Sequence, residues 1–227
     1  MSSCEAERRP TITAYVGSGG KTGSIRLRAE ALRAEGRRVL VTTTTHILPE
    51  PGCVTGGDPE PILRALRERG LVWAGTPAAE GKLGALPEAC FRACCREADE
   101  VLVEADGSRQ LPLKYPAPHE PVIPAGTARI VVVAGLRGLG QPVCEVCHRP
   151  ELVCRCLGIT EDTPIGAEHV ARLLEEGYLR RLERDRPDAE LRVLLCGQDT
   201  EARRAAALKI GALLRAERPG LRMGDGR

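Results

Sequence analysis

The residues best suited to chemistry lie in a short glycine loop, Val16-Gly17-Ser18-Gly19-Gly20-Lys21-Thr22. Glycines let the backbone fold so that successive N–H groups point at phosphate oxygens. In loops of this type the lysine reaches the β- and γ-phosphates, and the hydroxyl that follows it ligates Mg²⁺. We therefore expect Mg²⁺ with ATP, or with another nucleoside triphosphate, to bind at Gly17, Ser18, Gly19, Gly20, Lys21 and Thr22, with Lys21 stabilising phosphate charge.

The loop departs from the full pattern G-x-x-x-x-G-K-[ST], because Tyr15 stands where that pattern has its first glycine. The remaining G-x-x-G-K-T is similar to the shorter loop of Mur ligases and folylpolyglutamate synthases. The alternative is a glycine turn between a strand and a helix that binds nothing. The flanks favour binding, since residues 11–16 read as a strand and Ile25, Ala29 and Leu32 recur at helical spacing.

Two carboxylates, Glu104 and Asp106, follow the apolar stretch 101–103. Residues two apart in an extended chain point to the same face. One can hold Mg²⁺ together with Thr22, and the other can orient or deprotonate a nucleophile. The alternative is an ordinary Asp-Gly turn at the end of a strand; the glycine loop makes a catalytic and magnesium site at Glu104 and Asp106 the better hypothesis.

Polar residues at the ends of two other predicted strands are candidates for nucleotide contacts. Thr43 and Thr44 belong to a run of four threonines that can face the phosphate loop, although threonine is also simply a good strand residue. Asp199 lies where P-loop GTPases place the aspartate that reads the base. Cys196 and Gly197 replace the Asn and Lys of that GTPase loop, so guanine recognition is doubtful.

The segment 111–124 holds five prolines, which excludes a helix or a central strand. A stiff loop after a carboxylate-bearing strand is well placed to present side chains to a second substrate. We assign Lys114, His119 and Glu120 to that role. The alternative is a solvated connector.

The ten cysteines include a C-x-x-C pair, Cys144 and Cys147, which suggests zinc binding or thiol chemistry. Cys154 and Cys156 follow on a predicted helix over 150–157. They would lie about 200° apart on it and could not both bind one metal. We therefore expect most of these thiols to be packing residues.

The charge balance and the apolar runs of the sequence restrict the partners and the location that we expect. The 227 residues carry 33 Lys and Arg against 31 Asp and Glu, and this near balance gives no argument for a nucleic-acid or membrane partner. The first residues lack the apolar stretch of a signal peptide, and no apolar run is long enough to span a membrane. We expect a cytoplasmic protein.

The predicted elements alternate between strands and helices, which is typical of an α/β fold with a mostly parallel sheet. We expect three layers, resembling P-loop NTPases, in a single domain over 10–217, with a flexible N-terminus at 1–9 and a tail at 218–227. Helices are predicted after Asp58-Pro59, over 87–98, after Thr163-Pro164 and after Thr200.

Taken together, the motifs resemble the YqeC family, accessory proteins associated with selenium-dependent molybdenum hydroxylases. The resemblance spans about residues 10–215 and is carried by the glycine loop, Val41-Thr42-Thr43-Thr44-Thr45-His46, Glu104-Ala105-Asp106-Gly107-Ser108, Leu113-Lys114, His119-Glu120-Pro121-Val122-Ile123-Pro124 and His148-Arg149-Pro150-Glu151-Leu152. It implies a nucleotide-dependent role in making or inserting the selenium cofactor, with a molybdenum hydroxylase or its cofactor as partner.

Three functional hypotheses remain at this point. The first is an ATPase or a phosphoryl or nucleotidyl transferase in cofactor maturation. The second is a nucleotide-gated chaperone or switch that delivers selenium or cofactor to the hydroxylase. The third is a thiol or zinc protein that uses Cys144 and Cys147.

Overall fold

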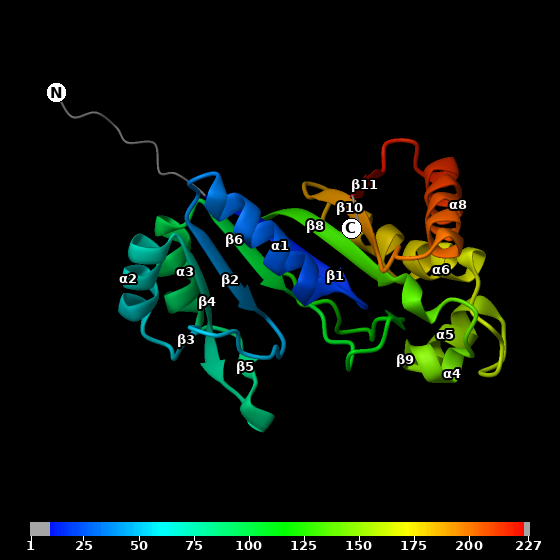
Figure 1. Ribbon diagram of the computed structural model, residues 1–227, viewed down its shortest axis with the longest axis horizontal. Coiled ribbons are helices and arrows are strands. Elements are labelled where there is room, and N and C mark those ends of the chain that lie inside the picture. The colour runs from blue at the N-terminus through cyan, green and yellow to red at the C-terminus, as the bar shows by residue number, and fades with distance from the viewer. Residues whose placement is uncertain (1–9, 225–227) are drawn as a thin grey trace. The chain divides into compact units, whose positions relative to one another are not determined.

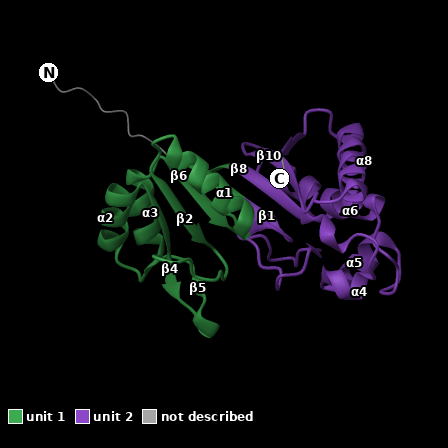
Figure 2. Ribbon diagram, in the orientation of Figure 1, with its two compact units in different colours: residues 1–14, 22–105, 123–128 green, residues 15–21, 106–122, 129–227 purple. Residues whose placement is uncertain are grey.

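The computed structural model describes residues 10–224. These residues form two compact units, each built from separate stretches of chain (Figure 2). Within the described range, unit 1 holds residues 10–14, 22–105 and 123–128, and unit 2 holds 15–21, 106–122 and 129–224. The predicted flexible N-terminus, residues 1–9, lies outside the described residues.

Unit 1 contains three helices and the strands between them (Figure 1). In chain order its elements are α1 (Lys21–Ala34, from Thr22 on), β2 (Val39–Thr43), β3 (Val54–Thr55), α2 (Pro59–Arg69), β4 (Leu71–Pro77), the short turn η1 (Ala79–Gly81), β5 (Leu83–Gly84), α3 (Glu88–Glu97) and β6 (Glu100–Glu104).

Unit 2 holds most of the C-terminal half of the chain. Its elements are β7 (Leu113–Lys114), most of β8 (Thr127–Gly135), η2 (Leu136–Gly138), α4 (Val143–Val146), β9 (Cys147–His148), α5 (Pro150–Leu157), α6 (Ala167–Leu174), the π-helical turn η3 (Glu175–Leu179), α7 (Arg180–Asp185), β10 (Glu190–Cys196), α8 (Glu201–Glu217) and β11 (Arg222–Gly224).

The main sheet has the strand order β11-β10-β8-β1-β6-β2-β4-β3, with β5 paired to β4; β1 spans Thr11–Gly17. The register of β2 with β4 and β6, and of β10 with β8 and β11, is parallel, whereas β4 and β5 are antiparallel. Every residue of β2 and β6 is buried, as expected for parallel strands covered on both faces. The predicted three-layer α/β architecture with a mostly parallel sheet is confirmed.

Local signals in the sequence correctly gave several element boundaries. The Asp58 carboxylate accepts a hydrogen bond from the Glu60 N–H and caps α2, and Gly70 ends that helix in a left-handed conformation. The apolar stripe of α1, at Ile25, Ala29 and Leu32, is buried.

Two expectations about elements differ from the structure. The helix predicted after Thr163-Pro164 is present as α6, but it begins only at Ala167, because the Ile165 N–H donates to Gln141 O and keeps this stretch extended. Within the predicted tail, Arg222–Gly224 form strand β11, which pairs with β10.

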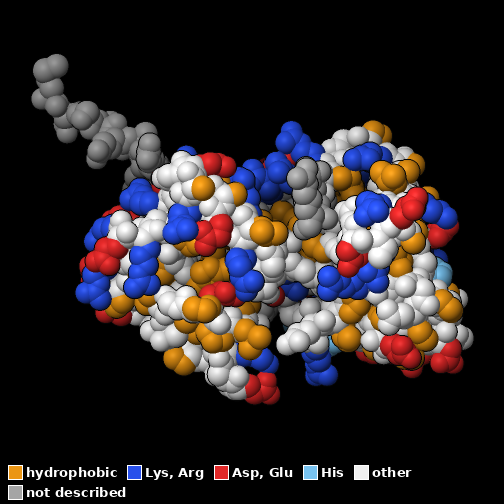
Figure 3. Space-filling view, in the orientation of Figure 1, with side chains coloured by type: hydrophobic (Ala, Val, Ile, Leu, Met, Phe, Trp, Pro, Cys, Tyr) orange, Lys and Arg blue, Asp and Glu red, His pale blue; other side chains and the backbone are white. Residues whose placement is uncertain are grey.

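The surface of each unit carries both signs of charge. In Figure 3, Lys and Arg side chains are interspersed with Asp and Glu over the visible face. Among the described residues, the helices are all too short or too polar to cross a membrane.

Candidate phosphate-binding loop and its buried network

The glycine loop begins where β1 ends, and its glycines have conformations that other residues rarely adopt. Gly17, Gly19 and Gly20 have φ angles of 87°, 73° and 135°. A Cβ on Gly17 would lie 2.2 Å from Val133 O, and one on Gly19 would lie 2.4 Å from Pro112 O. The loop is therefore a tight backbone turn against two neighbouring segments of unit 2, and only glycine fits these positions.

Gly17→Ala is expected to lower the free energy of unfolding by about 2–4 kcal/mol. Alanine is strained at the left-handed φ of this position, and its Cβ would also collide with the Val133 carbonyl. The matched control is Gly23→Ala, whose Cβ would meet nothing within 4 Å, in helix α1. That change should stabilise the protein slightly, since alanine favours helix over glycine by about 1 kcal/mol. Urea unfolding of both variants makes the comparison, and equal stability of Gly17→Ala and wild type would contradict it.

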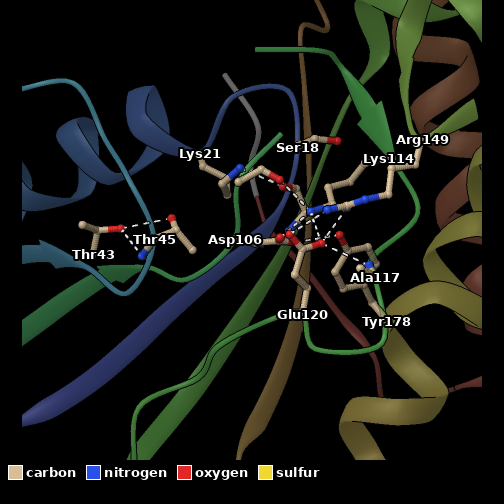
Figure 4. Close-up of polar contacts among 12 residues, drawn as sticks. Ser18, Lys21, Thr43, Thr45, Asp106, Lys114, Ala117, Glu120, Arg149 and Tyr178 are labelled. Carbon is tan, nitrogen blue, oxygen red and sulfur yellow. Dashed lines mark hydrogen bonds and ion pairs between the residues drawn. The ribbon is translucent and has the colours of Figure 1, made fainter. Parts of the chain in front are cut away.

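Asp106 holds the start of the loop from a fully buried position (Figure 4). Its Oδ2 accepts hydrogen bonds from the Gly17 N–H at 3.0 Å and from the Tyr178 hydroxyl at 2.7 Å. Its Oδ1 forms an ion pair with Lys114 Nζ at 2.5 Å, and both side chains are 0% exposed. A carboxylate with three partners in a dry environment is rigidly placed, so it fixes the loop backbone.

A second carboxylate, Glu120, extends this network within unit 2. Lys114 Nζ also contacts Glu120 Oε2 at 2.8 Å, and the Arg149 guanidinium grips both Glu120 oxygens at 2.7 and 3.1 Å. Burial disfavours the charged form of Glu120, but hydrogen bonds from Arg149 and Lys114 outweigh burial and lower its pKa to about 2. Lys114 thus pairs with both carboxylates, and Arg149 pairs with Glu120.

This lowered pKa predicts a specific loss of stability in acid. The folded-state pKa lies below the ordinary value of 4.5, so the stabilisation from Glu120 is complete above pH 4.5 and is lost as the pH falls toward 2. In Glu120→Gln this contribution is absent. The difference in unfolding free energy between wild type and Glu120→Gln should therefore shrink steadily between pH 5 and pH 2.5, roughly the window that linkage gives. A difference that stays constant over this range would contradict the assignment.

Lys21 lies at the end of the loop and at the first position of α1. It is 4% exposed, and its Nζ donates to Gly17 O at 2.7 Å. This contact spans the loop and places the ammonium against the loop's own backbone. Lys21, the cation predicted to contact phosphate, therefore also stabilises the conformation of the loop.

The first two N–H groups of the loop have protein acceptors. The Gly17 N–H donates to Asp106, and the Ser18 N–H donates to Val133 O at 2.9 Å. The Ser18 hydroxyl donates to Pro112 O. The N–H groups of Gly17 and Ser18 therefore hold the loop in place, which corrects the expectation that these two N–H groups point at phosphate.

Four predicted residues meet within unit 1. The Thr22 hydroxyl, one residue after Lys21, donates to Glu104 Oε2 at 2.8 Å. The Glu104 carbonyl accepts hydrogen bonds from the Thr43 hydroxyl at 2.8 Å and the Thr44 N–H at 3.1 Å. The hydroxyl and carboxylate oxygens of Thr22 and Glu104 are ligands that Mg²⁺ prefers.

His119 and Asp199 do not join the Asp106 network. His119 is exposed. Asp199 is also exposed, and its carboxylate pairs with Arg203 at 2.6 Å and with Arg137 at 3.5 Å. The roles predicted for these two residues stay predictions.

The sequence did not predict that Tyr178 and Arg149 take part in this buried network. A buried tyrosine hydroxyl needs a hydrogen-bond partner, and for Tyr178 that partner is Asp106. Tyr178 lies in the π-helical turn η3, a feature often found at functional sites. No spacing rule links Arg149 to Glu120 across 29 residues.

The cysteine pair has two different environments. Cys144 is exposed, whereas Cys147 is buried, and burial raises the pKa of the Cys147 thiol to about 12. Within residues 10–224 no group of three or more His, Cys, Asp or Glu side chains is arranged to hold a metal ion.

Comparison with known proteins gives two matches. A family model described as "YqeC protein" matches residues 13–151, more than half of the chain. The Escherichia coli (strain K12) protein named "Uncharacterized protein YqeC" is 37% identical over 177 residues, which cover 74% of this chain and 69% of the relative. The residues matched by the family model include the glycine loop and Asp106.

Proposed function

The chain belongs to the YqeC family, and from the geometry of its loop we propose that it binds a magnesium nucleoside triphosphate, with ATP the first candidate, at Gly17–Thr22. The observation that supports this most strongly is the loop itself. Three left-handed glycines form a turn that admits no Cβ, and the turn leads through Lys21 into a 14-residue helix. A helix N-terminus preceded by such a turn attracts phosphate through its N–H groups and its dipole.

Thr22 and Glu104 are the proposed magnesium ligands. Their side-chain oxygens are 2.8 Å apart, and Glu104 is 8% exposed, so a metal there would meet a nearly dry carboxylate. Bound Mg²⁺ would neutralise charge on the phosphate oxygens. Asp106, predicted as a third ligand, already has three protein partners, which supports a role in holding the loop.

We place this activity in maturation of the selenium-dependent cofactor of molybdenum hydroxylases, by ATP hydrolysis or by phosphoryl or nucleotidyl transfer. Family membership supports the pathway, through the resemblance described above, and the loop supports the nucleotide. Transfer of a phosphoryl group depends mainly on positioning and electrostatics, so a lysine, a metal site and a fixed loop would suffice.

The metal assignment is tested by titrating ATP with and without Mg²⁺ into wild type and Thr22→Val. Wild type should bind ATP at least about tenfold more tightly with Mg²⁺, a difference of roughly 1.4 kcal/mol, and Thr22→Val should lose that gain because it removes a ligand. Thr55→Val, at an exposed strand residue of unit 1, is the control and should behave as wild type. An unchanged magnesium effect in Thr22→Val would contradict the ligand assignment. No nucleotide binding by wild type would contradict the function.

A further inference from the structure

Unit 2 contains an open pocket of about 510 Å³, apart from the glycine loop. This volume is in the range of small-molecule sites. The charged, imidazole and thiol side chains that line it are those of Arg109, Cys144, Cys147, His148, Arg149 and Glu151.

The two arginines that line this pocket differ in their protein partners. Arg149 is held by Glu120, as described above. Among residues 10–224, by contrast, the Arg109 guanidinium has no hydrogen-bond or ion-pair partner. Glu151 is the one carboxylate among the lining residues that the structure describes. An arginine that lines a cavity and has no protein partner among the described residues is suited to bind an oxyanion from solution.

The backbone around the pocket also points to a ligand. Arg109 and Arg149 both have left-handed conformations, with φ of 49° and 62°. Such conformations cost on the order of 1 kcal/mol each for residues other than glycine and gather at binding sites. Arg149 is also the N-cap residue of α5, and Glu151 lies in its first turn, where the helix dipole adds positive potential.

The surroundings of His148 also carry positive charge. Its pKa is lowered, first by burial and then by the positive charges of Arg149, Lys114 and Arg109. A neutral imidazole in a positive field can donate a hydrogen bond to an anion without itself adding charge.

We propose that this pocket binds the oxyanion group, phosphate or carboxylate, of the small-molecule substrate that reacts with the nucleotide. The pocket and the loop are joined by direct contacts within unit 2: Arg149 holds Glu120, Glu120 and Asp106 share Lys114, and Asp106 holds Gly17. The binding of an anion follows from the pocket alone, whereas its role as a second substrate rests on the proposed function.

Cys144 provides a reporter inside the pocket, because its exposed thiol lines the cavity. Alkylation of the full-length protein by uncharged iodoacetamide, mapped by mass spectrometry, should slow at Cys144 at least about fivefold with saturating pyrophosphate or citrate at constant ionic strength. Cys53, in unit 1, serves as the internal reference. Protection by pyrophosphate alone identifies a phosphate ligand, and protection by citrate alone identifies a carboxylate ligand.

Arg109→Gly removes the guanidinium and relieves the left-handed strain, so it should fold at least as well as wild type and lose the protection. Arg155→Ala, at an exposed arginine of α5 outside the pocket, is the charge-matched control and should keep it. No protection by either anion, or equal protection in Arg109→Gly, would overturn the proposal. Lys21→Ala should keep the protection while losing nucleotide. Failure of the pocket and failure of the nucleotide site are therefore distinguishable.

Discussion

Asp106→Asn is expected to lower the free energy of unfolding by about 3–5 kcal/mol, the usual cost of removing one partner from a buried ion pair. The substitution replaces a charged partner of the buried Lys114 with a neutral amide, so that among residues 10–224 Glu120 is the one carboxylate still paired with it. It also weakens the acceptor that holds Gly17, so the glycine loop should loosen together with the core. The expected effect thus combines an electrostatic cost with loss of the loop's anchor.

Urea unfolding followed by circular dichroism measures this loss of stability. Two further variants serve as a comparison and as a control. Tyr178→Phe removes one hydrogen bond to the same carboxylate and should cost about 1.5–3 kcal/mol. Asp162→Asn, at an exposed aspartate of unit 2, should leave the midpoint unchanged. If Asp106→Asn proved no less stable than Tyr178→Phe, the ion pair would not be the main constraint on the loop.

The sequence was most informative where local chemistry decides structure. The glycine loop, the cap at Asp58 and the buried stretches at β2, β6 and β8 follow from glycine freedom, side-chain capping and continuous apolar runs. The short strands β7 and β9 could not be predicted, because their two-residue pairing depends on a contact between distant segments. The same holds for Ile165, whose partner Gln141 keeps it out of a helix.

For the candidate site, sequence reasoning placed some of the predicted residues next to one another correctly, but it did not give all of their partners. Thr22 and Glu104 were expected together and do meet. Asp106 was expected beside a metal, but it is enclosed by Lys114, Tyr178 and the Gly17 N–H. Spacing along the chain shows which face a carboxylate shares with its neighbour, whereas its partners come from segments far away in sequence. The pocket lined by Arg109 and Arg149 was not predicted, since these two residues belong to no motif of regular spacing.

Lys21→Ala is expected to weaken nucleotide binding by at least about 100-fold, or roughly 2.7 kcal/mol, because it removes the charge that would face the β- and γ-phosphates. The variant should still unfold cooperatively, since the loop keeps its glycines and its Asp106 anchor. Lys209→Ala, at an exposed lysine of α8, controls for the change in net charge and should bind as wild type does.

The central claim is that the glycine loop is a nucleotide site, and calorimetric titration of Mg·ATP, Mg·GTP and Mg·CTP into wild type and Lys21→Ala tests it most directly. We predict that wild type binds at least one of these nucleotides and that Lys21→Ala loses this binding while remaining folded; the preferred base would then narrow the reaction class. Binding that is equally tight in Lys21→Ala, or no binding of any of the three by wild type, would contradict the claim.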